Sequence, residues 1–277
     1  MTGKVTLVGA GPGGRELLTL AGAAAIEKAD AVVFDRLVNE DILGLIPETA
    51  ERVNVGKESN HHPVPQDQIN EILVRLAKEG KNVVRLKGGD CYLFGRGGEE
   101  CEYLLENGVP FQVIPGVTSA LAAPAFAGIP VTHRDFCSSV HIITAHARAG
   151  KPPQIDFGSL VKAGGTLVFL MGLTALEQVM DGLLSAHIAP DMPAAVIENG
   201  TRGNQRKVVA TVSDLAPQVR AAGLKSPALI VVGKVCTLSD KLDWFTPLPL
   251  HGKTVVVTRP RERAGTPAAR LREQGGD

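Results

Sequence analysis

The sequence lacks the features typical of proteins that bind nucleic acid or lipid. Its 29 Lys and Arg residues equal its 29 Asp and Glu residues, so the formal net charge is zero and a dominant basic surface is not expected. Only 4% of the residues are aromatic, which leaves few side chains for stacking on bases. No apolar run approaches the roughly 20 residues of a membrane span, and no signal peptide precedes the first predicted strand. We therefore expect a cytoplasmic protein that binds neither nucleic acid nor membranes.

The cysteines show no pattern of a metal site or of a disulfide redox motif. There are four of them, with no C-x-x-C pair and no accompanying histidines at ligand spacing. They are Cys91, Cys101, Cys137 and Cys236. We predict reduced thiols and no bound metal.

A long glycine-rich loop follows the apolar segment 83–86 and is the central feature of the chain. The segment predicts a buried strand, and Gly88 and Gly89 come after it, where the missing Cβ atoms let a ligand approach the backbone. Asp90 then offers a carboxylate to a hydroxyl or an amine, and three further glycines lead to a helix predicted from Glu99. Ligands of open α/β sheets bind outside the carboxyl ends of the strands. The length and charge of this loop favour a binding role over a plain connection without a ligand, which is the alternative.

A second glycine-rich stretch, residues 9–14, matches the G-x-G-x-x-G pattern of dinucleotide-binding folds. Asp35 closes a strand predicted over residues 31–34, at about the spacing of the acid that binds the ribose in those folds. In those folds, however, the helix begins at the glycines. Here the N-cap is predicted later, at Thr19. A flavin or nicotinamide oxidoreductase is therefore an alternative with weak support.

The order of the predicted elements indicates an α/β protein with two α/β domains. In the first part, strands alternate with helices as in a mostly parallel sheet. A segment rich in Gly, Pro and Lys after residue 145 indicates a boundary, and a second α/β domain follows. The strands predicted for the first domain include residues 4–8, 31–34, 52–55, 83–86, 111–114 and 140–144. The predicted domains are residues 1–147, 148–246 and 247–277.

Seven short motifs together resemble those of the uroporphyrinogen-III C-methyltransferases, which belong to the tetrapyrrole methylase family. Single motifs are shared with other members of the family, but the combination of the glycine-rich loop with Thr-His-Arg is specific to a much smaller group of proteins. The resemblance runs from about residue 5 to residue 245. The motifs are residues 8–13, 35–38, 56–57, 86–100, 115–120, 128–134 and 226–233.

The resemblance implies two α/β domains with mostly parallel or mixed sheets and a cleft for cofactor and substrate between them. It implies S-adenosylmethionine as the cofactor, S-adenosylhomocysteine as its product, and uroporphyrinogen III as a substrate that is methylated at two ring carbons. The product would be precorrin-2, made through precorrin-1, for sirohaem or cobalamin biosynthesis, and the enzyme would be a homodimer. A related methyltransferase that acts on a later precorrin is the main alternative.

The segment 247–277 resembles the start of a uroporphyrinogen-III synthase domain, with a strand near residues 253–258 and a helix after it. A single strand and helix cannot bury enough surface to fold alone. We therefore expect this segment either to pack on the methylase or to be loosely held. We also expect a longer, bifunctional natural polypeptide.

Matching motifs imply roles for individual residues. Asp35 falls where the family has a general base and Lys57 where it has a proton donor; an ion pair between Asp35 and Arg36 without a catalytic role is the alternative. The implied cofactor contacts are Pro12, Gly88, Gly89, Asp90, Leu93, Thr118, Ser119, Met171, Gly200 and Ala228. The substrate carries many carboxylates, which suit arginine forks. The basic residues in predicted strand-end loops are Arg36, Lys57, Lys87, Arg96, Arg134, Arg202 and Arg206. The substrate contacts that we predict among them are Arg36, Arg96, Arg134 and Arg206.

Two positions differ from the usual pattern of the family. Cys91 stands where the family usually has proline, so the loop loses a fixed φ and gains a thiol that is a candidate for reactivity. Glu58 follows Lys57 where a basic residue is usual, so one expected contact with a substrate carboxylate is missing or replaced.

Overall fold

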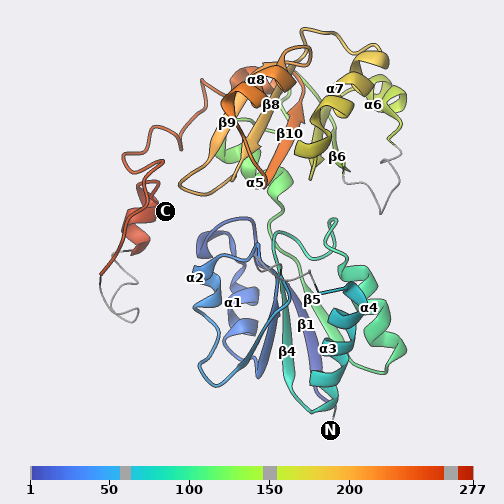
Figure 1. The fold of residues 1–277 in the computed structure, drawn as a ribbon, viewed down its shortest axis with the longest axis vertical. Coiled ribbons are helices and arrows are strands. Elements are labelled where there is room, and N and C mark those ends of the chain that lie inside the picture. The colour runs from blue at the N-terminus through green and yellow to red at the C-terminus, as the bar shows by residue number, and fades with distance from the viewer. Residues whose placement is uncertain (1, 57–63, 146–154, 259–267, 277) are drawn as a thin grey trace. The chain divides into compact units, whose positions relative to one another are not determined.

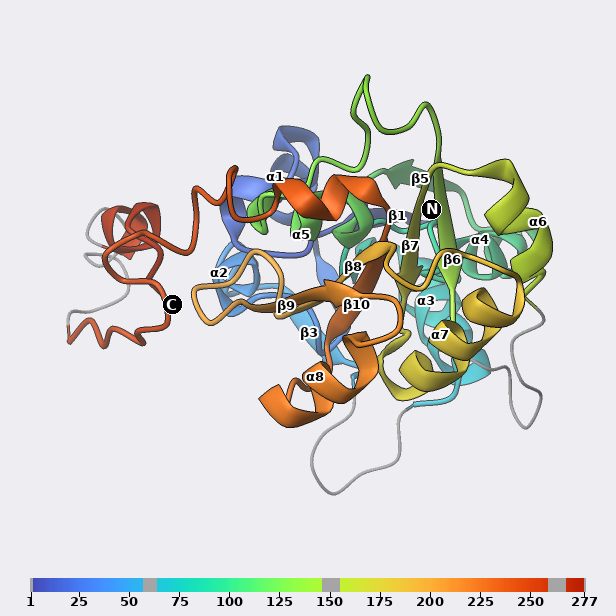
Figure 2. The ribbon, with the colours of Figure 1, turned by 90° about the horizontal axis from the view of Figure 1, so that it is seen from above.

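The computed structural model describes residues 2–56, 64–145, 155–258 and 268–276 (Figures 1 and 2). The chain divides into two compact units, Met1–Ser119 and Ala120–Asp277. Each unit contains one five-stranded sheet with helices packed on it. The predicted α/β class with parallel and mixed sheets is confirmed. None of the helices in the described residues is long and apolar enough to cross a membrane.

The first unit contains a parallel sheet with strand order β3-β2-β4-β1-β5. Of the three inner strands, β1 and β4 are buried from their second residue onward, as strands covered by helices on both faces require. All neighbouring pairs are parallel, so the carboxyl ends of the five strands meet at one edge of the sheet. The strands are β1 (Lys4–Gly9), β2 (Ala31–Phe34), β3 (Glu51–Asn54), β4 (Asn82–Lys87) and β5 (Phe111–Ile114).

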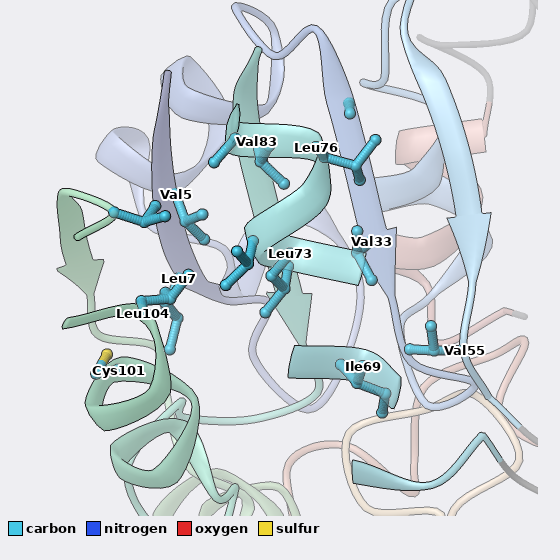
Figure 3. Packing of buried hydrophobic residues seen from close by; sticks show 14 of the residues in the cluster. Val5, Leu7, Val33, Val55, Ile69, Leu73, Leu76, Val83, Cys101 and Leu104 are labelled. Carbon is cyan, nitrogen blue, oxygen red and sulfur yellow. The ribbon is translucent and has the colours of Figure 1, made fainter. Parts of the chain in front are cut away.

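Helices cover both faces of this sheet, α1 and α2 on one side and α3 and α4 on the other (Figure 1). Leu73 and Leu76 of α3 pack with Val5 and Val83 in one apolar cluster (Figure 3). Val8 of β1 belongs to the cluster on the opposite face, because successive side chains of a strand alternate between faces. The helices are α1 (Leu20–Ile26), α2 (Glu40–Leu43), α3 (Gln66–Lys78) and α4 (Gly97–Glu106).

The second unit contains a mixed sheet with strand order β6-β7-β10-β8-β9. Strands β6 and β7 are parallel, whereas β10 runs antiparallel to both of its neighbours, β7 and β8. The strands are β6 (Val140–Thr144), β7 (Thr166–Leu170), β8 (Pro193–Glu198), β9 (Arg206–Thr211) and β10 (Ala228–Val232). The helices are α5 (Ser119–Phe126), α6 (Phe157–Ala163), α7 (Leu176–Ser185) and α8 (Leu215–Ala222).

One strand belongs to a different sheet from the one predicted. The sequence placed residues 140–144 in the first sheet, but β6 pairs with β7 along its whole length, from Val140 opposite Thr166 to Thr144 opposite Leu170. The division into units after Ser119 likewise lies earlier than the predicted boundary between residues 147 and 148. The local pattern identifies a strand, whereas the sheet that it joins depends on pairing with residues further along the chain.

The predicted strand near residues 253–258 does not form in the structure. The residues just before this segment, up to Gly252, pack instead on the second unit. The Phe245 ring is buried, lies 4.9 Å from the Phe126 ring and makes an edge contact with His251 at 5.3 Å. The Gly252 N–H donates to the Gly203 carbonyl at 2.7 Å. The beginning of the C-terminal segment is therefore packed against this unit.

Candidate active site

Three strand ends of the first sheet meet in a junction of glycines. An ideal Cβ on Gly9 would lie 2.5 Å from the Gly116 nitrogen, and one on Gly116 would overlap the Gly89 carbonyl oxygen. Only glycine allows backbones to approach so closely. Gly11 and Gly89 also exchange two backbone hydrogen bonds, of 3.1 and 2.9 Å. The loops after β1, β4 and β5 are thus joined at the carboxyl edge of the sheet.

This junction accounts for Gly9 and Gly11 of the glycine-rich stretch without a dinucleotide. The helix α1 begins after Thr19, as predicted, and the Thr19 Oγ1 accepts a hydrogen bond from the Gly22 N–H at 3.0 Å. Between the glycines and Thr19 lies only the 3-10 turn η1 (Arg15–Leu17). Gly9 and Gly11 contact the loop after β4, and no α-helix begins at the glycines. The structure therefore does not support the oxidoreductase alternative.

Gly89 borders open space at this edge. Its φ is +71°, and no atom of the described residues lies within 4 Å of the position that a Cβ would occupy. The Cβ position of Gly88, in contrast, lies 3.0 Å from the Leu37 side chain. One glycine of the pair therefore packs against the protein, and the other leaves room for a ligand to reach the backbone.

The Asp90 carboxylate holds the glycine-rich loop together. Its Oδ1 accepts hydrogen bonds from the Tyr92 and Leu93 N–H groups at 2.8 and 2.9 Å, and its Oδ2 accepts one from the Gly116 N–H at 3.0 Å. These contacts shape the turn after β4 and connect it to the loop after β5. The predicted contacts of Asp90 and Leu93 with a cofactor stay predictions.

The expectation of a reactive thiol at Cys91 is wrong. The residue is fully buried, and its Sγ donates to the Ile114 carbonyl at 3.7 Å. Burial, together with the nearby Asp90 charge, raises the pKa of Cys91 to about 12. Because the thiolate is the reactive form, this thiol is protonated and unreactive near neutral pH.

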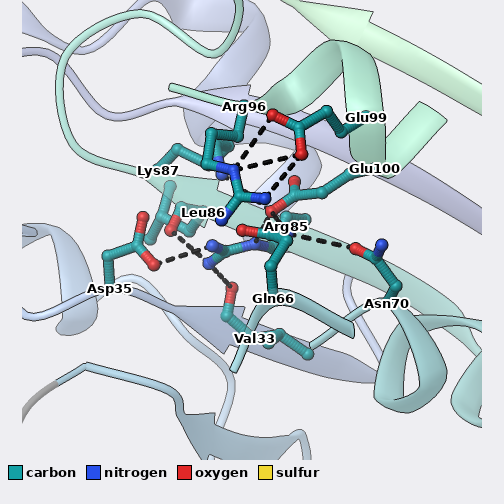
Figure 4. Close-up of polar contacts among 10 residues, drawn as sticks. All are labelled: Val33, Asp35, Gln66, Asn70, Arg85, Leu86, Lys87, Arg96, Glu99 and Glu100. Atoms are coloured by element: carbon teal, nitrogen blue, oxygen red, sulfur yellow. Dashed lines mark hydrogen bonds and ion pairs between the residues drawn. The ribbon is translucent and has the colours of Figure 1, made fainter. Parts of the chain in front are cut away.

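A chain of charged side chains extends from the sheet edge into the interior (Figure 4). Arg85 of β4 is buried and lies 2.7 Å from Asp35 and 3.1 Å from Glu100. Lys87, two residues later on the same strand, lies 2.8 Å from the same Glu100 oxygen. The Gln66 amide at the start of α3 also donates to that oxygen, at 3.0 Å. The Glu100 Oε1 thus accepts three donors, whereas its buried Oε2 has no hydrogen-bond partner among the described residues.

The surroundings of Arg85 in this network of charged side chains favour a permanently charged guanidinium. Burial alone would lower the pKa of Arg85, but the charges and hydrogen bonds of Asp35 and Glu100 outweigh this effect and the pKa is raised. A buried cation is tolerated when such partners neutralise it. Arg85 is therefore a fixed positive charge directly behind the sheet edge.

Asp35 is held at one oxygen and open at the other. It follows β2, and its side chain is 32% exposed. The Arg85 Nη2 donates to Oδ1, and no donor to Oδ2 occurs in the part of the chain that the structure describes. No Asp35–Arg36 ion pair forms between these two described residues, so the predicted alternative is wrong. The geometry suits a carboxylate that accepts a proton from a ligand.

The predicted substrate arginines of the first unit differ in their environments. Arg36 is exposed, and no ion pair to it occurs among the described residues. Arg96 is paired with Glu99 through Nη2 and Oε2 at 2.5 Å. Lys87, which was also a candidate, is buried against Glu100, so its prediction as a loop residue facing a substrate is wrong. Lys57 lies outside the described residues, as does Glu58, and the role of Lys57 stays a prediction.

In the second unit, Arg134 and Arg206 also differ. Arg134 is exposed in the loop before β6, and no ion pair to it occurs among the described residues. Arg206 lies 3.3 Å from the Glu198 carboxylate and donates a hydrogen bond to the Ala222 carbonyl. Arg206 thus has partners within its own unit, although its side chain is half exposed.

The predicted cofactor contacts of the second unit gather at one edge of its sheet. Ala228 begins β10 opposite Glu198, the last residue of β8, and Met171 directly follows the end of β7. Met171 has a φ of 54°, and the residues on both sides of Gly200 also have positive φ. Such backbone conformations in non-glycine residues cost about 1–3 kcal/mol and cluster at functional sites.

Two residues of the site were missed from the sequence. Arg85 interrupts an apolar strand, and a charged residue at a buried strand position needs a partner. Glu100 lies in the first turn of α4, where an acidic residue is common without any special role. The sequence shows that Arg85 is a charged residue in an apolar strand, but it does not show which residues are its partners. In the described residues, no group of three or more His, Cys, Asp or Glu side chains can hold a metal ion.

The fold and the site define an α/β protein whose first sheet has an edge of glycines with open space beside Gly89, and a partly exposed carboxylate, Asp35, at the same edge. The family model for Tetrapyrrole (Corrin/Porphyrin) Methylases matches residues 4–216. The chain belongs to this family.

Curated relatives carry names from porphyrin metabolism. The porphyrin biosynthesis protein HemD of Ruminiclostridium josui is 55% identical over 275 residues, which cover 99% of this chain and 55% of the relative. Siroheme synthase 2 of Klebsiella pneumoniae is 50% identical over 244 residues, covering 88% of this chain and 52% of the relative. The chain spans about half the length of these relatives.

Solved structures of the family share the fold. The uroporphyrin-III C-methyltransferase from Thermus thermophilus, complexed with S-adenyl homocysteine, aligns with a TM-score of 0.72 at 38% identity, covering 85% of this chain and 99% of that one. A cobalt precorrin-4 methyltransferase aligns with a TM-score of 0.75 at 29% identity, covering 84% and 95%. The predicted family and enzyme class, a methyltransferase of tetrapyrroles, are confirmed.

Proposed function

We propose that this chain catalyses the S-adenosylmethionine-dependent C-methylation of uroporphyrinogen III at two ring carbons, giving precorrin-2 through precorrin-1. The observation that carries this proposal is the similarity to the Thermus thermophilus uroporphyrin-III C-methyltransferase over 99% of that enzyme. That structure contains S-adenyl homocysteine, the product form of the cofactor. The reaction would serve sirohaem or cobalamin biosynthesis.

The described residues fit such a cofactor. The open space beside Gly89 lets a ligand reach the backbone, and Asp90 keeps the loop in place through three N–H groups. When bound, the cofactor supplies an electrophilic methyl group. The contacts proposed at the first sheet edge are Pro12, Gly88, Gly89, Asp90, Leu93, Thr118 and Ser119. Those proposed at the edge of the second sheet are Met171, Gly200 and Ala228.

The residues of the chain then orient the substrate and manage its proton. A ring carbon that gains a methyl group through its π electrons leaves the ring with an extra positive charge, which disappears when a proton departs. We assign that proton to the Asp35 Oδ2, because Oδ1 is occupied by Arg85 at 2.7 Å. The resemblance alone makes Lys57 the proposed proton donor. Arg36 and Arg134, both exposed, are proposed to bind substrate carboxylates as bidentate forks, and Arg96 and Arg206 to do so after exchanging their present partners.

An anaerobic incubation with uroporphyrinogen III and S-adenosylmethionine, followed by absorbance and by mass spectrometry after oxidation, tests the proposal. We expect a gain of two methyl masses that requires S-adenosylmethionine and is lost in Asp35→Ala. Unchanged binding of S-adenosylmethionine by Asp35→Ala is the control for folding. A wild-type protein that binds the cofactor but transfers no methyl group would overturn the proposed substrate and leave the family membership intact.

A later precorrin is the second candidate substrate. The cobalt precorrin-4 methyltransferase aligns with this chain at a TM-score of 0.75, so the fold accommodates such substrates. The lower identity, 29% against 38%, favours uroporphyrinogen III. The same assay with precorrin-2 as the methyl acceptor distinguishes the two candidates.

We further propose that residues 247–277 begin a uroporphyrinogen-III synthase domain of a bifunctional polypeptide. The similarity to the Ruminiclostridium josui HemD protein extends over 275 residues of this chain and therefore reaches into this segment. That similarity supports the proposal, although no strand forms over residues 253–258. A synthase assay on the complete gene product tests it, and a complete product with methylase activity alone would overturn it.

We also propose that the enzyme works in the cytoplasm as a homodimer. The resemblance supports the dimer, and the four free cysteines, three of them buried, suit a reducing compartment. Sedimentation at twice the chain mass of 29.1 kDa is the expected result. A monomer at micromolar concentration would overturn the proposed dimer.

A further inference from the structure

Arg85 connects the proposed base to the interior of the first unit (Figure 4). All three of its guanidinium nitrogens are engaged. Nη2 donates to the Asp35 Oδ1 at 2.7 Å, Nε donates to the Glu100 Oε1 at 3.1 Å, and Nη1 lies 3.4 Å from the carbonyl oxygens of Val33 and Leu86. A planar guanidinium held at every nitrogen has a fixed orientation, and it imposes that orientation on its partners.

The charges of this network balance only when Asp35 is included. Arg85, Lys87 and Glu100 are 1%, 3% and 0% exposed and together carry two positive charges and one negative charge. Asp35 supplies the second negative charge from the half-buried edge of the sheet. Because an uncompensated buried charge is costly, the Asp35 carboxylate is held against Arg85.

We propose that Arg85 is a positioning residue that fixes the Asp35 carboxylate for proton acceptance, and that Glu100 fixes Arg85 in turn. Arg85 occupies Oδ1, so Oδ2 is the oxygen left for the substrate. Arg85 itself is buried and does not touch the substrate. This inference rests on the proposed function, in which Asp35 accepts the proton.

A purely structural role accounts less well for this arrangement. A buried ion pair contributes little net stability, since apolar residues of similar volume often stabilise a core as well or better. The residues on either side of Arg85 in β4, Val84 and Leu86, are buried and apolar. The guanidinium instead contacts a carboxylate at the edge where the ligand is proposed to bind. Misplacement of a reacting group by about 1 Å can lower a rate about a hundredfold, which gives a positioning residue a large effect.

The test compares Arg85→Met with Lys87→Met. Methionine fills a similar volume, and in Arg85→Met the charges of the two buried residues Lys87 and Glu100 still cancel, so that only the partly exposed Asp35 loses its partner. Lys87 contacts the same Glu100 oxygen but not Asp35. Lys87→Met is therefore the matched control for the loss of a buried cation. We expect kcat to fall about ten- to a hundredfold in Arg85→Met and by less than about threefold in Lys87→Met. KM for S-adenosylmethionine should change in neither.

A double-variant cycle separates positioning from damage to the fold. If Arg85 acts through Asp35, Arg85→Met should lower kcat no further in the background of Asp35→Asn. Additive losses, or an unchanged kcat in the single variant, would overturn the proposal.

Crystal structures of the wild type and of Arg85→Met supply a readout without turnover. We expect one Asp35 orientation in the wild type and a different or divided one in the variant. An unchanged orientation would overturn the positioning role whatever the substrate is. A wild type that is inactive on uroporphyrinogen III would instead overturn the proposed function, and the crystallographic comparison would still decide the role of Arg85.

Discussion

Among single residues, Arg85 shows what a local pattern reveals and what it hides. The apolar run around it correctly predicts a buried strand, but the run does not identify the partners of a charge at its centre. Those partners are 50 residues earlier and 15 residues later in the chain. Asp35, in contrast, was predicted as a site residue from its motif, and the alternative prediction, an ion pair with the adjacent Arg36, was wrong. Residue identity was predictable here, and pairing was not.

The burial of Cys91 leads to a prediction about the reactivity of its thiol. With the pKa of the thiol raised to about 12, the thiolate fraction at pH 8 is on the order of 10⁻⁴. We expect iodoacetamide at pH 8 to leave Cys91 unmodified in the native protein and to label it after denaturation. Mass spectrometry of tryptic peptides measures both. The partly exposed Cys137 is the internal control. Native labelling of Cys91 at the rate of Cys137 would contradict its burial.

Among the helices and strands, features that depend on neighbouring residues were predicted correctly, whereas the pairing of strands was not. The N-cap at Thr19 depends on neighbouring residues, and it was predicted correctly. The sheet to which β6 belongs depends on its pairing with Thr166–Leu170, and it was predicted wrongly. The late start of the helix after the glycines of residues 9–14 was also predicted correctly, because the distance from the glycines to the helix is itself a local feature.

The glycine junction leads to a prediction about the strand-end loops. A Cβ at residue 116 would overlap the backbone of Gly89 and Gly9, and backbone atoms cannot move aside without displacing the loops after β4 and β1. We expect Gly116→Ala to lower the free energy of unfolding by about 1–3 kcal/mol and to weaken S-adenosylmethionine binding at least tenfold. Urea denaturation and calorimetric titration measure the two effects.

Gly98→Ala is the matched control for this change. No atom lies within 4 Å of the Cβ position of Gly98 among the described residues, and its φ is not positive. Since alanine restricts the unfolded chain more than glycine does, this variant should be neutral or more stable by about 0.4–1 kcal/mol. Equal losses in the two variants would show that the junction has no special role.

For the whole molecule, we expect the packing of the C-terminal segment to affect stability but not catalysis. Residues after 246 contact the second unit through the Gly252–Gly203 hydrogen bond and the ring of His251 on Phe245. The network around Asp35 lies entirely within the first unit. Removing residues 247–277 should therefore expose apolar surface near Phe245 and lower the Tm by a few degrees, since about 1 kcal/mol corresponds to roughly 2–4 °C in a chain of this size. The kcat for methyl transfer should be unchanged.

The two quantities are measured on the same preparations, by thermal unfolding and by the methyl-transfer assay below the Tm of the shortened chain. A chain that ends after Gly252 is the control, because it keeps the hydrogen bond to Gly203 and the ring of His251, and it should recover most of the lost stability. If kcat falls in step with the removal of residues 247–252, the segment supports the active site. The contacts of this segment with the second unit would then be needed for full activity. A synthase domain that continues from the segment would be coupled to methyl transfer through the same contacts.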